Sequence, residues 1–199
     1  RENPKLLDEV NACLAEGDLK YNGNLNVRHL QDVLYNDIGV DKIKEKVVRS
    51  LDGLKVAGYV GCQSVRPYGE YDSVNKPKVQ DHLIEALGAE AVPFPNKIKC
   101  CGSGIFLPEM DYCMELVKNI LEDALNHGAD VISTICPMCA MNLELYQGRI
   151  NDKYGTDFDV PILYLTQLMA IAFGMDMKKD AALNYNVIPP EGVIQAAIG

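Results

Sequence analysis

Five cysteines have the residue type and spacing to do chemistry in this chain. They follow the pattern C-x37-CC-x34-CxxC, and they are Cys62, Cys100, Cys101, Cys136 and Cys139. A CxxC pair alone also serves zinc knuckles and thioredoxin-like redox pairs. Here three further cysteines accompany it, two of them adjacent in the stretch KIKCCGSG. Because thiolates are soft ligands, this set indicates zinc, copper(I) or an iron–sulfur cluster.

The number of cysteines helps to separate these metals. Structural zinc takes four ligands in a tetrahedron, so five converging thiolates would leave one spare and would crowd Cys100 against Cys101. An iron–sulfur cluster extends further in space and can take adjacent cysteines on different irons. Gly102 and Gly104 agree with a cluster, since glycine permits close approach of main-chain N–H groups to cluster sulfides. We therefore expect a multinuclear cluster, with zinc as the alternative.

The elements between the cysteines predict how they are brought together. The apolar runs LKVAGYVG, AEAVPF, DVISTIC and VPILYL predict strands, and the stretches between them predict helices. This alternation predicts an α/β fold with a doubly wound, mainly parallel sheet of the Rossmann or flavodoxin-like type. Ligands of such sheets bind beyond the carboxyl ends of the strands. Cys62 and Cys136 end strands and Cys100 follows another, so we expect them at one edge of the sheet.

The first 50 residues predict a helical lead-in to this sheet. Three stretches there have apolar residues at helical spacing: KLLDEVNACLA, VRHLQDVLYND and the segment through Ile43 and Val47. We therefore divide the chain into a lead-in at 1–50 and a cysteine-rich iron–sulfur domain at 51–199.

Charge and hydropathy argue against two classes of partner. The chain has 19 basic and 28 acidic residues and a formal charge of −9, with no Lys/Arg run interleaved with aromatics, which argues against nucleic acid. The most apolar window, 160–175, is shorter than the roughly 20 residues that span a bilayer. It predicts a buried strand followed by a buried helix, and no direct membrane span. An odd count of seven cysteines without a secretion signal favours a cytoplasmic location over disulfide bracing.

These motifs carry a family resemblance. The sequence resembles the CCG-type cysteine-rich domain and, over nearly its whole length, the B subunit of the heterodisulfide reductase of methanogenic archaea. The matching stretches are NVRHLQDVLYNDIG, LKVAGYVGCQSVRP, KCCGSG, CPMC and PILYLTQLMAIAFG. The resemblance implies an oxidoreductase that reduces the mixed disulfide of coenzyme M and coenzyme B, with heterodisulfide reductase subunits A and C as partners. It also implies a non-cubane 4Fe-4S cluster held by the five motif cysteines.

The family carries two such cysteine modules in each subunit. The two cysteines outside the motif, Cys13 and Cys113, fit no second module and are expected to pack as small hydrophobes. The chain is therefore expected to hold one module, which corresponds to the C-terminal one of the family, and half of a two-cluster site.

Three further residues are candidates for the site. Arg66, four residues after the first motif cysteine, is expected to bind the sulfonate or phosphate of the coenzymes, with a surface salt bridge as the alternative. His29 is a candidate proton donor to a leaving thiolate, with packing or helix capping as the alternative. Gly102 is expected to contact the cofactor.

Two other functions stay open from the sequence. The chain also resembles the electron-transfer or quinone-linked CCG subunits of glycolate or lactate oxidases and of unusual succinate dehydrogenases, which would cleave no disulfide here. A zinc-stabilised interaction domain is the third possibility.

Overall fold

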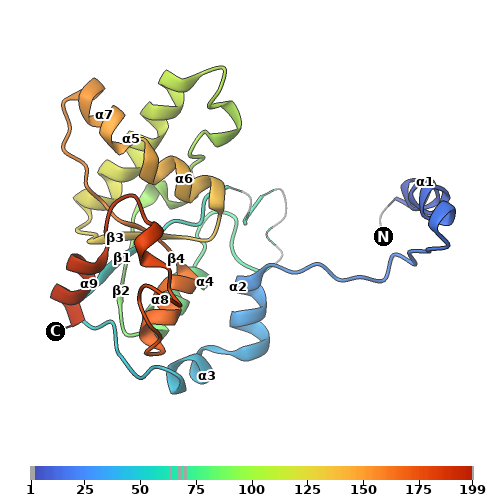
Figure 1. Cartoon of the computed structure of the whole chain (residues 1–199), viewed down its shortest axis with the longest axis horizontal. Coiled ribbons are helices and arrows are strands. Elements are labelled where there is room, and N and C mark those ends of the chain that lie inside the picture. Colours follow the sequence, from blue (N-terminus) through green and yellow to red (C-terminus); the bar gives the residue numbers. More distant parts are fainter. Residues whose placement is uncertain (1–2, 63, 67–68, 70, 199) are drawn as a thin grey trace. The chain divides into compact units, whose positions relative to one another are not determined.

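The structure of the chain, a computed structural model, describes residues 3–62, 64–66, 69 and 71–198 (Figure 1). Two compact units are present, Arg1–Leu30 and Gln31–Gly199. The predicted division at residue 50, into a lead-in and a cysteine-rich domain, differs from this observed division after Leu30 and stays a prediction.

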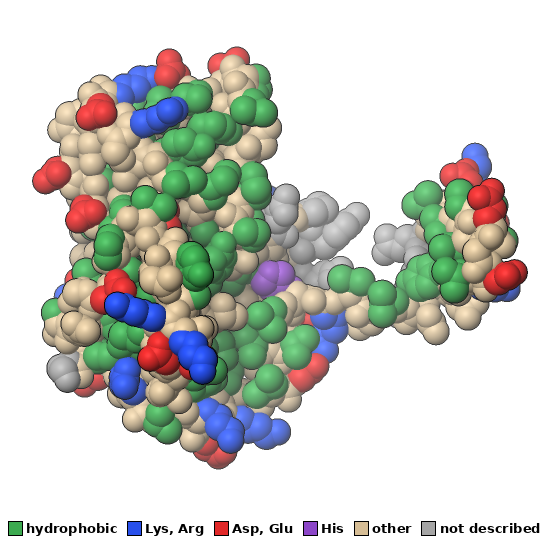
Figure 2. Space-filling model, viewed as in Figure 1, with side chains coloured by type: hydrophobic (Ala, Val, Ile, Leu, Met, Phe, Trp, Pro, Cys, Tyr) green, Lys and Arg blue, Asp and Glu red, His purple; other side chains and the backbone are tan. Residues whose placement is uncertain are grey.

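The smaller unit consists of one helix and the loop that folds onto it. Helix α1 spans Pro4–Leu14 and continues into a 3₁₀ turn at Ala15–Gly17. The side chain of Asn11 holds the loop, since it donates to Tyr21 O at 2.9 Å and accepts from Tyr21 N at 2.8 Å. The expected helix is confirmed, but α1 buries none of its residues. Hydrophobic side chains are therefore visible on the surface of this unit (Figure 2).

Short helical segments follow from the last residue of the smaller unit into the larger one. Helix α2 spans Leu30–Asp32, a π-helical turn follows at Val33–Ile38, and α3 spans Val40–Glu45. Leu34 and Ile43 are buried and join the core beneath the sheet. The second and third expected stretches are helical, over 30–38 and Val40–Glu45, and most of the second is π-helical.

The sheet of the larger unit has four strands, all parallel. They are β1 Lys55–Gly58, β2 Glu90–Val92, β3 Val131–Thr134 and β4 Ile162–Tyr164. Their order is β2-β1-β3-β4, so β1 lies inside the sheet and pairs with both β2 and β3. The predicted parallel sheet is confirmed.

Helices cover both faces of this sheet (Figure 1). One face carries α4 Val79–Ala86, α8 Leu165–Ala172 and α9 Glu191–Ile198, and the other carries α5 Met110–Asn126, α6 Pro137–Leu145 and α7 Gln147–Tyr154. Successive residues of a strand point to opposite faces of the sheet. Val56 packs in the first core, on the face of α4, α8 and α9, and Ala57 packs in the second core, on the face of α5, α6 and α7. The doubly wound α/β fold is therefore confirmed.

The most apolar window of the sequence folds as predicted. Strand β4 runs directly into α8, and Leu165, Leu168 and Ile171 of that helix are buried in the first core. Among the described residues, none of the helices combines the length and apolarity needed to cross a membrane.

Candidate functional site

Three loops carry the motif cysteines to the carboxyl edge of the sheet. The chain leaves β1 and reaches Cys62 four residues later, and it leaves β3 and reaches Cys136 two residues later. After β2 a 3₁₀ turn, Pro95–Ile98, leads to Cys100. Because the strands are parallel, their carboxyl ends lie at one edge, and the loops meet there as the sequence predicted.

Hydrogen bonds tie the first two loops together. The backbone N–H groups of Val60 and Gly61 both donate to Lys97 O, at 3.1 and 2.9 Å. The fully buried side chain of Tyr59 adds a third bond, from its hydroxyl to Lys99 O at 2.6 Å. The segment that precedes Cys62 is thereby fixed against the segment that precedes Cys100.

Two of the cysteines form a buried pair. The sulfurs of Cys101 and Cys139 lie 3.5 Å apart, and their residues are only 2% and 6% exposed. The hydrogen bond between Cys101 and Cys139 lowers the pKa of Cys101 to about 6, against the opposing effect of burial. The same bond, followed by burial and by the charges of Cys101 and Cys136, raises the pKa of Cys139. The two buried sulfurs therefore share one hydrogen bond.

The remaining motif cysteines continue this pair into a row. Burial raises the pKa of Cys62, and the negative charge of Cys100 and a hydrogen bond with it raise it further. Cys136 contacts Cys139, whose pKa it helps to raise. The row thus runs from Cys62 through the adjacent pair to Cys139 and Cys136. Cys100 is its solvent-exposed member.

The arrangement of the five cysteine thiols indicates which kind of metal centre they could bind. Across the described ranges, no three or more His, Cys, Asp or Glu side chains surround one point as the ligands of a single metal ion would. The thiols instead meet in successive pairs at one sheet edge. Five soft thiol donors at one sheet edge are one more than a tetrahedral zinc site takes, and they fit a cofactor that takes its ligands on several metal atoms, as an iron–sulfur cluster does.

Tyr59 belongs to this site although the sequence alone gave it no role there. Burial raises the pKa of its hydroxyl, and the neighbouring sulfurs of Cys139 and Cys101 raise it further. Its O–H is held by Lys99 O, so the side chain stays neutral and supports the loop. The run LKVAGYVG predicted a strand residue here, and only the non-local bond to Lys99 identifies its function in the site.

Asn142 and Cys113 complete the buried side of the site. Asn142 is fully buried and donates from Nδ2 to Cys101 O at 3.1 Å, and Cys113 donates from Sγ to the same oxygen at 3.3 Å. The position of Asn142 three residues after Cys139 puts both on one face of α6, a signal that was available in CPMCAMN. The expectation that Cys113 packs in the core is confirmed, whereas for Cys13 it is wrong: Cys13 is exposed because α1 buries nothing.

Gly102 has a backbone conformation that favours glycine. Its φ is +79°, and a Cβ there would lie 3.0 Å from the sulfur of Cys113 and 3.2 Å from the Cα of that residue. We expect Gly102→Ala to lower the free energy of unfolding by about 1–2 kcal/mol, because alanine is strained in a left-handed backbone conformation. The contact of the new Cβ with Cys113 should lower it further. Gly104→Ala is the matched control, because nothing lies within 4 Å of a Cβ at Gly104. Calorimetry of the metal-free proteins measures both, and equal losses would contradict the argument.

The two candidate catalytic residues lie in different units of the chain. His29 belongs to the unit Arg1–Leu30, whereas all five motif cysteines belong to the other unit. Arg66 is in the larger unit, exposed, four residues beyond Cys62. The catalytic roles of His29 and Arg66 stay predictions.

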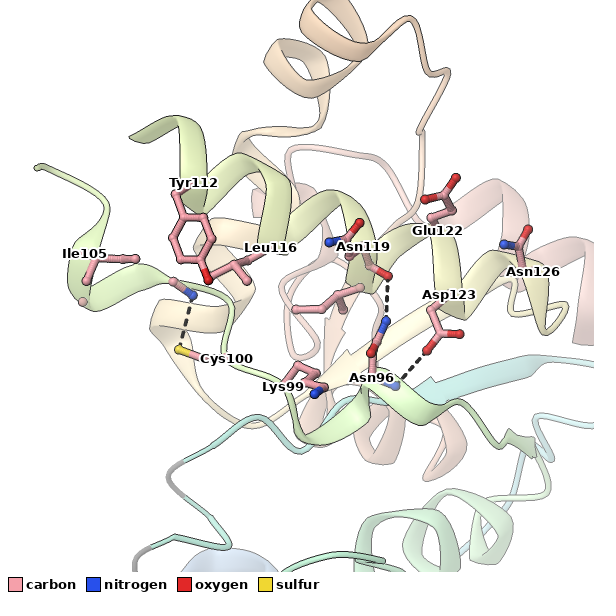
Figure 3. A pocket seen from close by; sticks show the side chains of 13 residues that line it. Asn96, Lys99, Cys100, Ile105, Tyr112, Leu116, Asn119, Glu122, Asp123 and Asn126 are labelled. Carbon is pink, nitrogen blue, oxygen red and sulfur yellow. Dashed lines mark hydrogen bonds between the residues drawn. The ribbon is translucent and has the colours of Figure 1, made fainter. Parts of the chain in front are cut away.

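A cavity of about 770 Å³ opens beside Cys100 (Figure 3). It runs along α5, with the apolar side chains of Tyr112 and Leu116 toward the cysteine end and the amides of Asn119 and Asn126 farther along the helix (Figure 3). The cavity therefore connects the exposed sulfur of the row to a long, partly apolar groove.

Charges of both signs border this cavity. Lys99, next to the vicinal pair, is the one cation among its described lining residues. The carboxylates are already engaged, since Glu122 binds Lys118 at 2.7 Å and Asp123 accepts the N–H of Asn96 at 2.7 Å. Among the described lining residues, the charge nearest the cysteines is thus positive, which favours an anionic ligand.

Comparison with known proteins relates this site to a family. The CCG cysteine-rich domain family matches residues 56–144, a span that holds all five motif cysteines. The chain is 37% identical to a protein of Archaeoglobus profundus that is named as similar to the B subunit of heterodisulfide reductase, over 91% of this chain and 62% of that protein. It is 32% identical to the B subunit of the ferredoxin:CoB-CoM heterodisulfide reductase of Methanosarcina mazei, over 87% and 59% of the two chains.

A further relative is named for a different activity. The chain is 35% identical to the 8-methylmenaquinol:fumarate reductase membrane anchor subunit of Wolinella succinogenes, over 91% of this chain and 63% of that one. The chain thus spans 59–63% of the length of these three relatives. A crystal structure of a hypothetical protein from Helicobacter pylori superposes with a TM-score of 0.70 at 15% identity, over 94% of this chain and 33% of that one, which shows a shared fold.

Proposed function

This chain belongs to the CCG cysteine-rich family and is related to heterodisulfide reductase B subunits, and on that premise we propose that it is an iron–sulfur subunit that reduces the mixed disulfide of coenzyme M and coenzyme B. The observation that carries the proposal is the row of thiols at the carboxyl edge of the sheet, with its exposed member beside the cavity.

The proposed cofactor is a non-cubane 4Fe-4S cluster. Its ligands would be the five motif cysteines, Cys62, Cys100, Cys101, Cys136 and Cys139. When bound, the cluster would supply single electrons and an iron open to a substrate sulfur. The chain itself contributes the buried sulfurs of Cys101 and Cys139, which exclude water from one side, and the N–H of Gly102, which donates to Cys100 Sγ at 3.3 Å.

The cavity along α5 is the proposed entry for the disulfide. Tyr112 and Leu116 offer an apolar wall for a hydrocarbon chain, and Lys99 offers a positive charge for an anionic group. Arg66 is proposed to bind a sulfonate or phosphate as well, and His29 to protonate a leaving thiolate. Both assignments rest on the sequence argument.

The reaction also sets what the partners must supply. Cleavage of one S–S bond consumes two electrons and two protons and yields two thiols, whereas a cluster passes one electron at a time. We propose heterodisulfide reductase subunits A and C as the electron source. A second cysteine module, which this chain's other cysteines do not form, would supply the other half of the two-cluster site.

One observation favours a second candidate function. The similarity to a menaquinol:fumarate reductase subunit fits a quinone-linked electron-transfer subunit that cleaves no disulfide. In that case the cluster would pass electrons between neighbouring subunits, and a thiol would not bind to it.

Anaerobic metal analysis with and without a thiol tests both functions. We expect about four irons and four acid-labile sulfides per chain, and an electron paramagnetic resonance spectrum of the oxidised cluster that changes when coenzyme M is added. A spectrum that ignores the thiol would contradict disulfide reduction and favour the quinone-linked function. Zinc without sulfide would contradict both, leaving the interaction domain.

A further inference from the structure

The amide of Asn142 is buried against the vicinal cysteines in an unusual way. Its Nδ2 lies 3.1 Å from Cys101 O, 3.3 Å from Cys113 Sγ and 3.9 Å from Cys101 Sγ. Its Oδ1 is buried and has no hydrogen-bond partner among the described residues. An unpaired buried amide oxygen costs about 1–3 kcal/mol. A residue placed at that cost needs a reason beyond packing.

The contact with Cys101 O fixes one peptide group. The carbonyl of the peptide between Cys101 and Gly102 accepts from Asn142 and from Cys113. The N–H of the same peptide donates to Cys100 Sγ at 3.3 Å (Figure 3). Because a peptide group is planar and its C=O and N–H point in opposite directions when trans, holding the carbonyl aims the N–H at the sulfur.

The left-handed backbone of Gly102 belongs to the same arrangement. Its φ of +79° turns the chain directly after the vicinal pair, and the space that a side chain would need there is filled by Cys113. Residues of helices α5 and α6 thus bind the carbonyl side of the peptide, while its N–H side faces Cys100, the exposed member of the thiol row.

We propose that Asn142 is a positioning residue for both vicinal cysteines. It aims the Gly102 N–H at Cys100 Sγ and holds its own amide N–H beside Cys101 Sγ. This role rests on the proposed function, in which these sulfurs bind the cluster. The positive end of an N–H dipole stabilises extra negative charge on a ligand sulfur, so Asn142 raises the reduction potential of the bound cluster.

Gln147 provides a matched control within the same core. Its amide is equally buried, at 2% exposure, but it donates to Leu143 O and Val160 O and accepts from Val160 N, all at 2.8–2.9 Å. Each of its bonds goes to backbone, and none goes to a sulfur. Replacement of Gln147 therefore measures how much stability the loss of a buried amide costs when no cysteine sulfur is involved.

The test compares Asn142→Leu with Gln147→Leu. Leucine is close to asparagine in shape, and it removes both the N–H donor and the unpaired oxygen. We expect the loaded Asn142→Leu protein either to show a lower reduction potential and an altered paramagnetic resonance spectrum, or to lose iron while it stays folded. The metal-free variant should keep a thermal midpoint close to that of the wild type. Gln147→Leu should show the reverse: a lower midpoint and an unchanged potential.

The outcomes separate this inference from the proposed function. If the wild type holds iron and sulfide and Asn142→Leu has the same iron content and potential, the positioning role is wrong and the proposed function stands. A wild type without iron and sulfide overturns both. If Asn142→Leu does not fold, Asn142→Ala, which also lacks the donor, is measured in its place, and an unchanged potential there overturns the role equally.

Discussion

Replacement of Cys101 by serine is expected to abolish the iron–sulfur centre, lowering the iron content from about four per chain to near zero. Cys101 lies in the middle of the thiol row: it directly follows Cys100 in the sequence, and its sulfur is 3.5 Å from that of Cys139. A serine hydroxyl is a harder and less acidic donor than a thiol, so it is a poor replacement for a thiolate ligand. Cys100→Ser is expected to have the same effect, and iron and sulfide analysis with the absorption spectrum measures both.

Cys113→Ser is the matched control for this replacement. Cys113 is also a buried thiol, and it donates to the carbonyl of Cys101 itself at 3.3 Å, a bond that a serine hydroxyl can keep. The iron content and spectrum of Cys113→Ser should therefore equal those of the wild type. Equal losses at Cys101 and Cys113 would show that the assigned ligand set is wrong.

Asp81→Ala is expected to destabilise the protein by about 3–5 kcal/mol. Both carboxylate oxygens of Asp81 bind the ammonium of Lys97, at 2.6 and 2.7 Å, and the two side chains are only 7% and 12% exposed. Removal of the carboxylate leaves a nearly buried cation without compensation. At roughly 2–4 °C per kcal/mol for a domain of this size, the thermal midpoint should fall by about 6–20 °C.

Two further variants make this prediction specific. Lys97→Met added to Asp81→Ala should restore most of the lost stability, since it removes the uncompensated cation. Asp111→Ala breaks an exposed ion pair with Lys153 of the same 2.6 Å length and should leave the midpoint near that of the wild type. A small effect of Asp81→Ala, similar to that of Asp111→Ala, would contradict the argument.

The ion pair also matters for the thiol row. Lys97 O accepts the N–H groups of Val60 and Gly61, so the backbone that leads to Cys62 depends on where Lys97 is held. We therefore expect Asp81→Ala to bind iron less firmly as well, although Asp81 itself lies outside the row.

The sequence by itself determined the parts of this protein that depend on local pattern. Alternating apolar runs predicted the strands, and parallel strands with crossover helices leave few ways to wind the sheet. Once the strands were placed, the positions of Cys62, Cys100 and Cys136 after them were enough to predict one common edge, because the carboxyl ends of parallel strands coincide.

Only the tertiary structure decided which residues support that edge. The bond of Tyr59 to Lys99 joins residues 40 apart, and the bond of Asn142 to Cys101 joins residues 41 apart. The spacing in CPMCAMN places Asn142 on the same helix face as Cys139, but neither partner, Lys99 or Cys101, can be read from a periodic pattern, because each pairing depends on how helices and loops pack across the sheet. The exposure of α1 was equally beyond the sequence, since an apolar helical stripe predicts a helix but does not predict what it packs against. The spacing of the vicinal cysteines is thus readable in the sequence, whereas the bonds from Asn142 and Cys113 to Cys101 O are visible only in the tertiary structure.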